Sequence, residues 1–142
     1  MVKDNSKVIL VVEDEIPLQD VVRVMLKKYN INVITARTVE QAKELVNGPE
    51  KINAIWLDHY LLGKENGLDF MAWCKSEDSK CRDTPVFVVS NSANLDQVIT
   101  YIHLGAKEYF VQSNYRLEEI IKKISAEINN PPTVANMPKT VQ

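Results

Sequence analysis

The sequence predicts one α/β domain in which helices cover both faces of a five-stranded parallel sheet. Five short apolar runs, rich in β-branched residues, alternate along the chain with five segments whose apolar residues recur every three or four positions. Such alternation is typical of βα units, which lay their strands in parallel and their helices on both faces of the sheet. A length of 142 residues suits a single hydrophobic core. We therefore expect a doubly wound (βα)₅ fold.

The strands are predicted from apolar runs that end in polar or glycine-containing segments. The first run is continuously apolar after Lys7, as expected of a central strand that is buried on both faces. The third run ends abruptly in the carboxylate of Asp58 and is followed by a loop that reaches Gly67. Pro85 opens the fourth run, where its missing N–H does least harm. The predicted strands are residues 7–12, 31–36, 52–58, 85–90 and 109–111.

Each strand is followed by a segment with helical periodicity. Pro17 suits the first turn of the first helix, and Asn30 ends that helix. Thr38 and Gln41 form a capping-box pattern at the start of the second helix, and Gly105 ends the fourth. The apolar residues that define the five helical faces are Leu18, Val21, Val22, Met25, Leu26 and Tyr29; Ala42, Leu45 and Val46; Leu68, Met71 and Cys74; Leu95, Val98, Ile99 and Ile102; and Leu117, Ile120, Ile121, Ile124 and Ile128.

Composition and charge exclude several classes of partner. The formal net charge is −2, and the lysines and arginines are dispersed, so no basic stripe indicates nucleic-acid binding. No apolar run approaches the roughly 20 residues that a membrane helix needs, and residues 1–6 lack the apolar core of a secretory signal. We therefore expect a cytoplasmic protein that binds neither nucleic acid nor membrane.

The expected organisation is a flexible start at residues 1–6, one folded domain at 7–129 and a disordered tail at 130–142, which contains prolines and no periodic pattern. Cys74 and Cys81 are the only cysteines, and their spacing matches neither a zinc knuckle nor a redox pair. We expect both cysteines to be reduced.

Polar side chains follow four of the predicted strands at their carboxyl ends. Because these ends lie at one edge of a parallel sheet, the side chains should share one crevice. They are Glu13 and Asp14 after the first strand, Asp58 at the third, Ser90 and Asn91 at the fourth, and Gln112 and Ser113 at the fifth.

The three carboxylates of this crevice predict a metal site. Neighbouring carboxylates repel one another, and protonation or a bound cation relieves the repulsion. A site of carboxylate oxygens without histidine or cysteine favours a hard ion such as Mg²⁺. Beside such an ion, Asp58 is the best placed nucleophile towards phosphorus, and the hydroxyl of Ser90 could bond a phosphoryl oxygen.

Four motifs now mark a known family. They are Val11-Val12-Glu13-Asp14-Glu15, Leu57-Asp58 with Gly67 downstream, residues 84–90 from Thr84 to Ser90, and residues 105–111 from Gly105 to Val111. In this order and at this spacing, over residues 7 to 128, the chain resembles the receiver domain of two-component response regulators. The resemblance implies a flavodoxin-like fold with strand order 2-1-3-4-5.

The resemblance also assigns roles to individual residues. Glu13 and Asp14 look like the acidic pair that holds Mg²⁺, with the backbone carbonyl of Tyr60 as a further ligand. Asp58, also expected to be a metal ligand, looks like the phosphoacceptor that takes its phosphoryl group from a histidine kinase or a phosphotransfer protein.

Two more residues resemble the family's switch. Ser90 looks like the switch hydroxyl, and Tyr109 looks like the aromatic side chain that changes orientation with it. In the family this change alters the face built from the fourth helix, the fifth strand and the fifth helix, where downstream proteins bind. Such a domain is not an enzyme beyond its own phosphotransfer and dephosphorylation.

Some positions depart from the family pattern. Gln112 stands where the family has a lysine after the fifth strand, and Ser113 replaces the proline that usually follows. An amide can donate a hydrogen bond to phosphate but brings no charge, so the metal must neutralise more of it. Leu62 stands where a proline is common, and Gly67 lies one residue further along than is typical.

Three functions compete. The first is a stand-alone receiver that is phosphorylated on Asp58 and signals by docking to another protein. The second is a pseudo-receiver that binds partners without phosphorylation, for which Gln112 and Ser113 are the reason. The third is a Mg²⁺-dependent phosphatase with an aspartyl nucleophile, but such enzymes have a second aspartate where this chain has Tyr60.

The histidines and tryptophans are expected to have no part in the chemistry of the site. His59 is expected to be an exposed loop histidine that is neither a ligand nor an acid–base group. His103 on the fourth helix is expected to have no chemical role, and Trp56 and Trp73 are expected to pack in the core.

Overall fold

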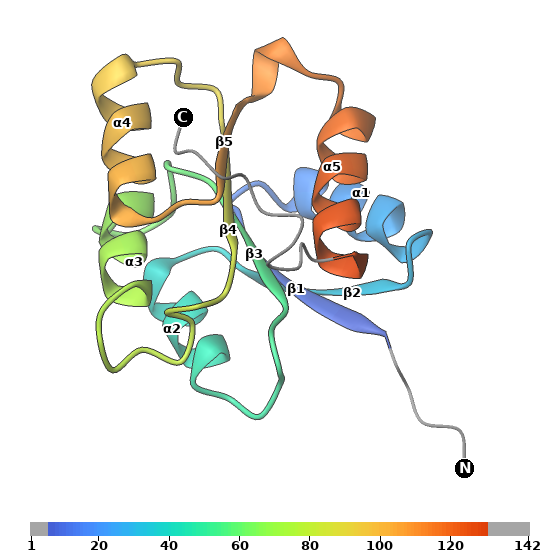
Figure 1. The fold of residues 1–142 in the computed structure, drawn as a ribbon, viewed down its shortest axis with the longest axis horizontal. Helices are drawn as coiled ribbons and strands as arrows, with labels where there is room; N and C mark the ends of the chain where they lie inside the picture. The colour runs from blue at the N-terminus through green and yellow to red at the C-terminus, as the bar shows by residue number, and fades with distance from the viewer. Residues whose placement is uncertain (1–5, 131–142) are drawn as a thin grey trace.

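A computed structural model describes residues 6–130 of the chain. The predicted flexible start and disordered tail fall almost wholly outside these residues. Five strands form one parallel sheet in the order β2-β1-β3-β4-β5, with helices on both faces (Figure 1). The predicted flavodoxin-like (βα)₅ fold is therefore confirmed.

The strands match the predicted apolar runs closely. The third strand is shorter than predicted, so Asp58 lies just beyond it rather than within it. Pro85 directly precedes the fourth strand, and the fifth begins one residue earlier, at Glu108. The strands are β1 Lys7–Val12, β2 Ile31–Ala36, β3 Ala54–Leu57, β4 Val86–Ser90 and β5 Glu108–Val111.

Five helices and one short 3₁₀ helix connect the strands. Thr38 caps the second helix, because its side chain accepts a hydrogen bond from the Gln41 amide at 3.0 Å. The Gln41 side chain bonds the amide of Arg37 rather than that of Thr38, so only half of the predicted capping box forms. Gly105 ends the fourth helix with a φ of 111°. The helices are α1 Ile16–Lys27, α2 Val39–Val46, α3 Gly67–Cys74, α4 Leu95–Leu104, η1 Gln112–Asn114 and α5 Leu117–Asn129.

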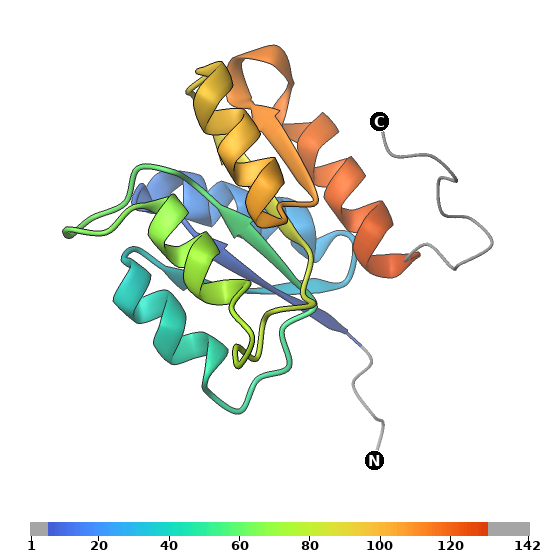
Figure 2. The ribbon, with the colours of Figure 1, turned by 60° about the vertical axis from the view of Figure 1, so that its left-hand side comes forward.

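The sheet separates two hydrophobic clusters. Helices α2, α3 and α4 pack on one face of the sheet, and α1 and α5 pack on the other, as Figures 1 and 2 show. Trp56 is fully buried among the residues on the α1 and α5 side, and Trp73 packs against the opposite cluster. Both tryptophans are thus packing residues, as predicted.

The apolar faces of two helices differ from the prediction. On α1, Val21 is exposed, whereas the polar Gln19 is buried with Val22 and Leu26. Tyr29, two residues beyond the end of this helix, is also exposed. On α4, three of the apolar residues assigned to the packed face are exposed, while Tyr101 is fully buried. The three exposed residues, which we call the α4 stripe, are Leu95, Ile99 and Ile102.

The two cysteines are paired, which corrects the expectation of reduced thiols. Cys74 ends α3 and Cys81 lies in the loop that precedes β4, and the two form a disulfide with Cα atoms 5.3 Å apart. The chain reverses direction after α3 and brings the second cysteine back to the first. Sequence spacing alone does not reveal that reversal.

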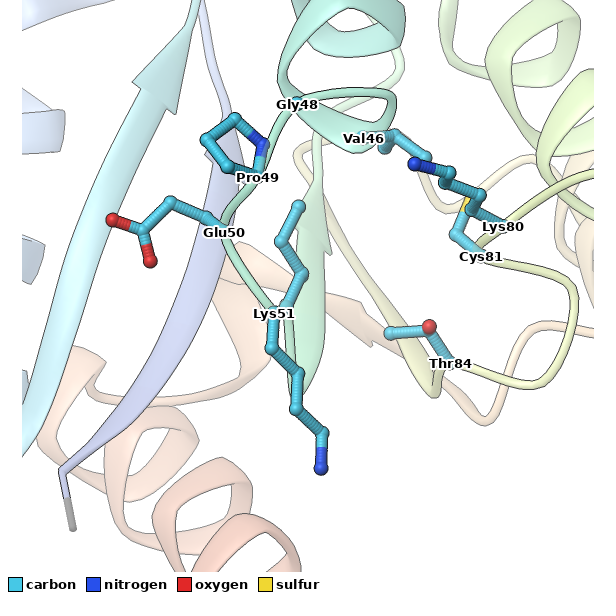
Figure 3. Close-up of a pocket in the computed structure, with 9 residues that line it drawn as sticks. Val46, Gly48, Pro49, Glu50, Lys51, Lys80, Cys81 and Thr84 are labelled. Carbon is cyan, nitrogen blue, oxygen red and sulfur yellow. The ribbon is translucent and has the colours of Figure 1, made fainter.

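A hollow of about 450 Å³ lies next to Cys81, between the segments that lead into β3 and β4 (Figure 3). Lys51, Lys80 and Thr84 are among its lining residues. It lies at the amino ends of the strands, and the polar residues of the predicted crevice lie at the opposite edge.

Among the helices of residues 6–130, none combines the length and the apolar composition that crossing a membrane requires.

Candidate functional site

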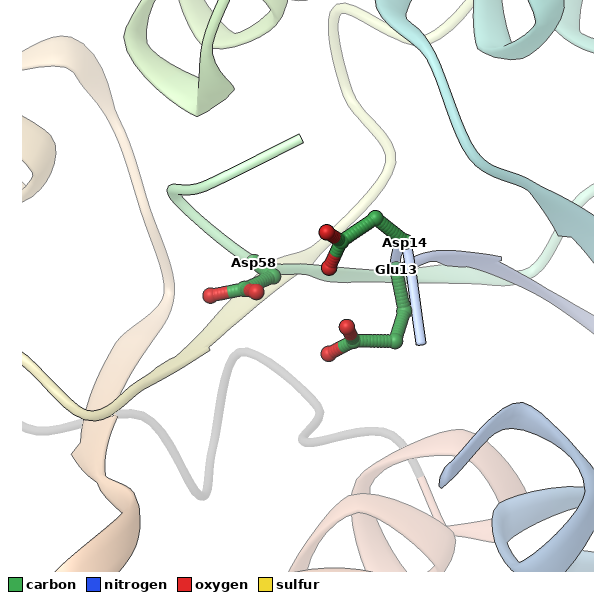
Figure 4. A group of neighbouring side chains, drawn as sticks. All are labelled: Glu13, Asp14 and Asp58. Atoms are coloured by element: carbon green, nitrogen blue, oxygen red, sulfur yellow. The ribbon is translucent and has the colours of Figure 1, made fainter. Parts of the chain in front are cut away.

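Three carboxylates meet at the carboxyl edge of the sheet (Figure 4). Glu13 and Asp14 follow β1, and Asp58 follows β3, which is the neighbouring strand. The register pairs Val12 with Leu57, and the Asp58 amide donates a hydrogen bond to the Val12 carbonyl at 3.0 Å. One carboxylate oxygen from each of the three residues lies within 4.8 Å of the other two. The structure therefore brings together the three carboxylates of the predicted crevice.

Backbone and side-chain hydrogen bonds fix the acidic pair in place. Glu13 is buried, and its carboxylate accepts a hydrogen bond from the Glu15 amide at 3.0 Å. The buried side-chain amide of Gln19 on α1 donates to the Glu13 carbonyl at 2.5 Å. The apolar pattern of α1 does not predict this role for Gln19, although its helical spacing with Val22 and Leu26 places it on the buried face.

The site carries negative charge that the protein does not neutralise. Burial, opposed by a hydrogen bond from the Glu15 amide and reinforced by the charges of Asp58 and Asp14, raises the pKa of Glu13 to about 8. Burial also raises the pKa of Asp58 to about 6, although its hydrogen bonds from the His59 and Tyr60 amides act in the other direction. Within residues 6–130, Lys123 forms an ion pair with Glu108, and no lysine or arginine forms an ion pair with the three carboxylates.

This donor set fits a hard divalent cation. Carboxylate oxygens are the ligands that Mg²⁺ prefers, and a bound cation would favour the charged form of these carboxylates against the burial and the mutual repulsion that raise the pKa values of Glu13 and Asp58. Tyr60 lies two residues beyond Asp58 with an exposed side chain, in the loop that leads to α3. In this loop the backbone amides of His59 and Tyr60 donate hydrogen bonds to the Asp58 carboxylate.

Ser90 ends β4, the strand next to β3, and its side chain is fully buried. The register pairs Leu57 with Val88, so Ser90 lies two residues further towards the edge that holds the carboxylates. Its hydroxyl accepts a hydrogen bond from the Ser92 amide at 3.2 Å. The hydroxyl is thus bonded to the loop between β4 and α4.

Tyr109 is bonded to the same loop. Its hydroxyl donates to the Ser92 carbonyl at 2.8 Å and accepts from the Gln97 side-chain amide at 2.9 Å. Ser90 and Tyr109 therefore share one partner residue, although they stand on different strands.

The model of the response regulator receiver domain family matches residues 9–125 of this chain. The chain belongs to this family. Receiver domains are signalling modules rather than classical enzymes, and they bind Mg²⁺ at an acidic pocket.

Among curated relatives, this receiver domain is 36% identical to the transcriptional regulatory protein DcuR of Escherichia coli over 84 residues, which are 55% of this chain and 31% of DcuR. It is 29% identical to the phosphate regulon transcriptional regulatory protein PhoB of Escherichia coli over 118 residues, which are 83% of this chain and 50% of PhoB. The matched regions thus span 31% of the length of DcuR and 50% of the length of PhoB.

Solved structures of response regulators resemble the receiver domain over nearly all of its length. The Mn(2+)-bound form of the response regulator Rcp1 has a TM-score of 0.70 and 28% identity, and the match covers 93% of this chain and 99% of that one. A response regulator from Thermotoga maritima has a TM-score of 0.73 and 25% identity, with 88% and 99% covered.

Gln112 begins the short helix η1 directly after β5, at the same edge of the sheet as the carboxylates. Its side chain is half-buried, and Ser113 beside it is exposed. The residue expected at the family's lysine position is therefore a neutral amide at this edge of the sheet.

His59 differs from the prediction of an exposed loop histidine. It is buried, and its Nδ1 shares a 2.7 Å hydrogen bond with the hydroxyl of Tyr101 on α4. Burial lowers the pKa of His59, against the charge of Asp69, which raises it. His103 is exposed.

Proposed function

We propose that this receiver domain accepts a phosphoryl group on Asp58, in a Mg²⁺-dependent reaction, from the phosphohistidine of a histidine kinase or a phosphotransfer protein. The observation that carries the proposal is the meeting of Glu13, Asp14 and Asp58 within 4.8 Å. Relatives such as DcuR and PhoB are transcriptional regulatory proteins, which is consistent with a role in signalling.

Mg²⁺ would be held by the carboxylates of Glu13, Asp14 and Asp58 and by the backbone carbonyl of Tyr60. When bound, the ion supplies positive charge for the phosphoryl oxygens. The response regulator Rcp1, which shares the fold, has a solved Mn(2+)-bound form, and this is consistent with divalent-cation binding by such a domain. Because this chain has Gln112 in place of a lysine, we expect an unusually strong dependence on the metal.

Asp58 would act as the nucleophile. One of its carboxylate oxygens bonds to phosphorus while the phosphorus–nitrogen bond of the phosphohistidine breaks, and the imidazole keeps that electron pair. The His59 amide, which donates to Asp58 Oδ1 at 2.7 Å, holds the carboxylate in a defined orientation.

Ser90 and Tyr109 would transmit the change. A phosphoryl oxygen on Asp58 would draw the Ser90 hydroxyl towards itself and away from the Ser92 amide. Tyr109 would respond because its hydroxyl is bonded to the Ser92 carbonyl. The change would then reach the beginning of α4 through Gln97.

The face formed by α4, β5 and α5 would bind the downstream protein. The α4 stripe leaves three large apolar side chains exposed, at 70%, 55% and 47% for Leu95, Ile99 and Ile102. Exposed apolar groups that adjoin one another mark interaction sites. The proposal places the domain in the cytoplasm, with its histidine kinase and its downstream partner.

The second candidate function is a pseudo-receiver that binds partners without phosphorylation. The neutral Gln112 favours it, because no lysine or arginine within residues 6–130 forms an ion pair with the carboxylates. Titration with Mg²⁺ and beryllofluoride, monitored at the backbone amides near Ser90 and Tyr109, separates the two functions. A pseudo-receiver should give no response there.

Intact-mass analysis after incubation with acetyl phosphate and Mg²⁺ tests the proposal. We expect the wild-type chain to gain one phosphoryl group and the Asp58→Asn variant to gain none. A wild-type chain that stays unmodified, as the variant does, would contradict the proposal.

A further inference from the structure

The buried hydroxyl of Tyr101 joins α4 to the loop that carries Asp58. Tyr101 is fully buried, and its hydroxyl lies 2.7 Å from His59 Nδ1. His59 directly follows Asp58, and its amide donates to Asp58 Oδ1 at 2.7 Å. One side chain of α4 therefore holds the residue whose backbone orients the carboxylate of Asp58.

Gly67 closes the same loop around this hydroxyl. The Gly67 amide donates to the His59 carbonyl at 2.9 Å. A Cβ atom at position 67 would overlap the Tyr101 hydroxyl, and it would lie 2.7 Å from the Asp58 carbonyl oxygen and 3.0 Å from the Cα atom of His59. His59 and Gly67, near the two ends of this loop, thus lie against Tyr101, and there is no room for a side chain at position 67.

The other side of Tyr101 faces Tyr109. The centroids of the two rings are 5.7 Å apart, and the Tyr109 hydroxyl is bonded to Ser92 and Gln97. Tyr101 therefore contacts both the Asp58 loop and the side chain assigned as the switch. This connection does not pass through Ser90.

We infer that Tyr101 is a positioning residue that fixes the backbone at residues 58–60 for metal and phosphoryl binding and couples that site to the placement of α4. The inference rests on the proposed function. A loop that is already held in the binding geometry loses less conformational freedom when the ion binds, so affinity rises. Coupling between two binding sites is reciprocal. If a ligand at Asp58 changes the affinity for a partner that shifts α4, that partner must change the affinity for the ligand by the same factor.

The test compares Tyr101→Phe, which keeps the ring and removes the hydroxyl, with Tyr115→Phe as the matched control. Tyr115 packs edge-on against Phe110, on the α1 and α5 side of the sheet. Mg²⁺ and then beryllofluoride with Mg²⁺ are titrated into each protein, and the amide resonances of His59, Tyr60 and Gln97 are followed. Thermal unfolding of each variant measures its fold stability separately.

We expect Tyr101→Phe to bind Mg²⁺ about fivefold more weakly, the loss typical of one hydrogen bond. The Gln97 amide should respond less at saturating beryllofluoride, and Tyr115→Phe should match the wild type. His59→Ala should lose a similar factor, and combining it with Tyr101→Phe should add little, because both changes remove the same bond.

Each outcome separates the inference from the proposed function. If the wild type binds neither Mg²⁺ nor beryllofluoride, the proposed function fails. If the wild type binds both and a folded Tyr101→Phe variant binds equally well with an unchanged Gln97 response, the positioning role is refuted. If Tyr101→Phe does not fold, His59→Ala provides the same measurement, and unchanged Mg²⁺ affinity in that variant refutes the role.

Discussion

Replacing Asp58 by asparagine removes a negative charge beside Glu13 and Asp14 and should stabilise the metal-free protein. Two unit charges 4.8 Å apart, the span of the three oxygens, repel by about 3 kcal/mol at an effective dielectric constant of about 20. Asp58 is half-buried, and solvent and salt reduce this repulsion further. We therefore expect a gain of about 1–2 kcal/mol in the free energy of unfolding at pH 8.

The assay is urea unfolding at pH 8 in the presence of EDTA, with Glu77→Gln as the matched control. Glu77 is an exposed residue in the loop after α3, and its replacement should change stability by less than about 0.5 kcal/mol. In excess Mg²⁺ the order should reverse, because the wild type gains binding free energy that the variant partly loses.

An Asp58→Asn variant that is less stable than the wild type in EDTA at pH 8 would refute this reasoning. It would mean that the hydrogen bonds to the Asp58 carboxylate outweigh the repulsion within the cluster. A stabilisation that is equally large in EDTA and in excess Mg²⁺ would also count against a metal site.

Three further predictions concern the pH dependence of stability, Gly67 and Gln112. The pKa values of Glu13, about 8, and Asp58, about 6, lie above the ordinary values of 4.5 and 3.8, so the folded state binds protons that the unfolded chain releases. The free energy of unfolding in EDTA should therefore fall as the pH rises from about 4 to about 8. Urea midpoints that rise over this range would contradict the prediction. Gly67→Ala should destabilise the fold by about 2 kcal/mol, because its Cβ would overlap the Tyr101 hydroxyl, and an unchanged urea midpoint would show that the loop yields freely. Gln112→Lys should raise the yield of the beryllofluoride complex at limiting Mg²⁺, since a lysine supplies charge that the amide lacks, and an unchanged yield would place position 112 outside the site.

The fold could be predicted from the sequence because its signals are local. Apolar runs, helical periodicity and turn residues located all five strands and helices, and strands in parallel must deliver their following residues to one edge. This rule was sufficient to predict that three carboxylates, those of Glu13, Asp14 and Asp58, lie close together. The order of the strands came from the family resemblance, because alternation alone does not fix it.

The features that escaped prediction depend on tertiary packing. Periodicity shows that α4 has an apolar stripe, but not which side of the helix meets the sheet. The structure buries Tyr101 and exposes Leu95, Ile99 and Ile102. The burial of His59 follows from this arrangement, since its partner is the same tyrosine. The pairing of Cys74 with Cys81 likewise depends on a loop path that no local pattern encodes.

The measurement that tests the central claim most directly is the location of the phosphoryl group by peptide mapping, after acetyl phosphate treatment and reduction of the acyl phosphate with borohydride. The account predicts modification at Asp58 in Mg²⁺ and none in EDTA. Modification at another residue, or equal modification of Asp58 with and without the metal, would contradict it.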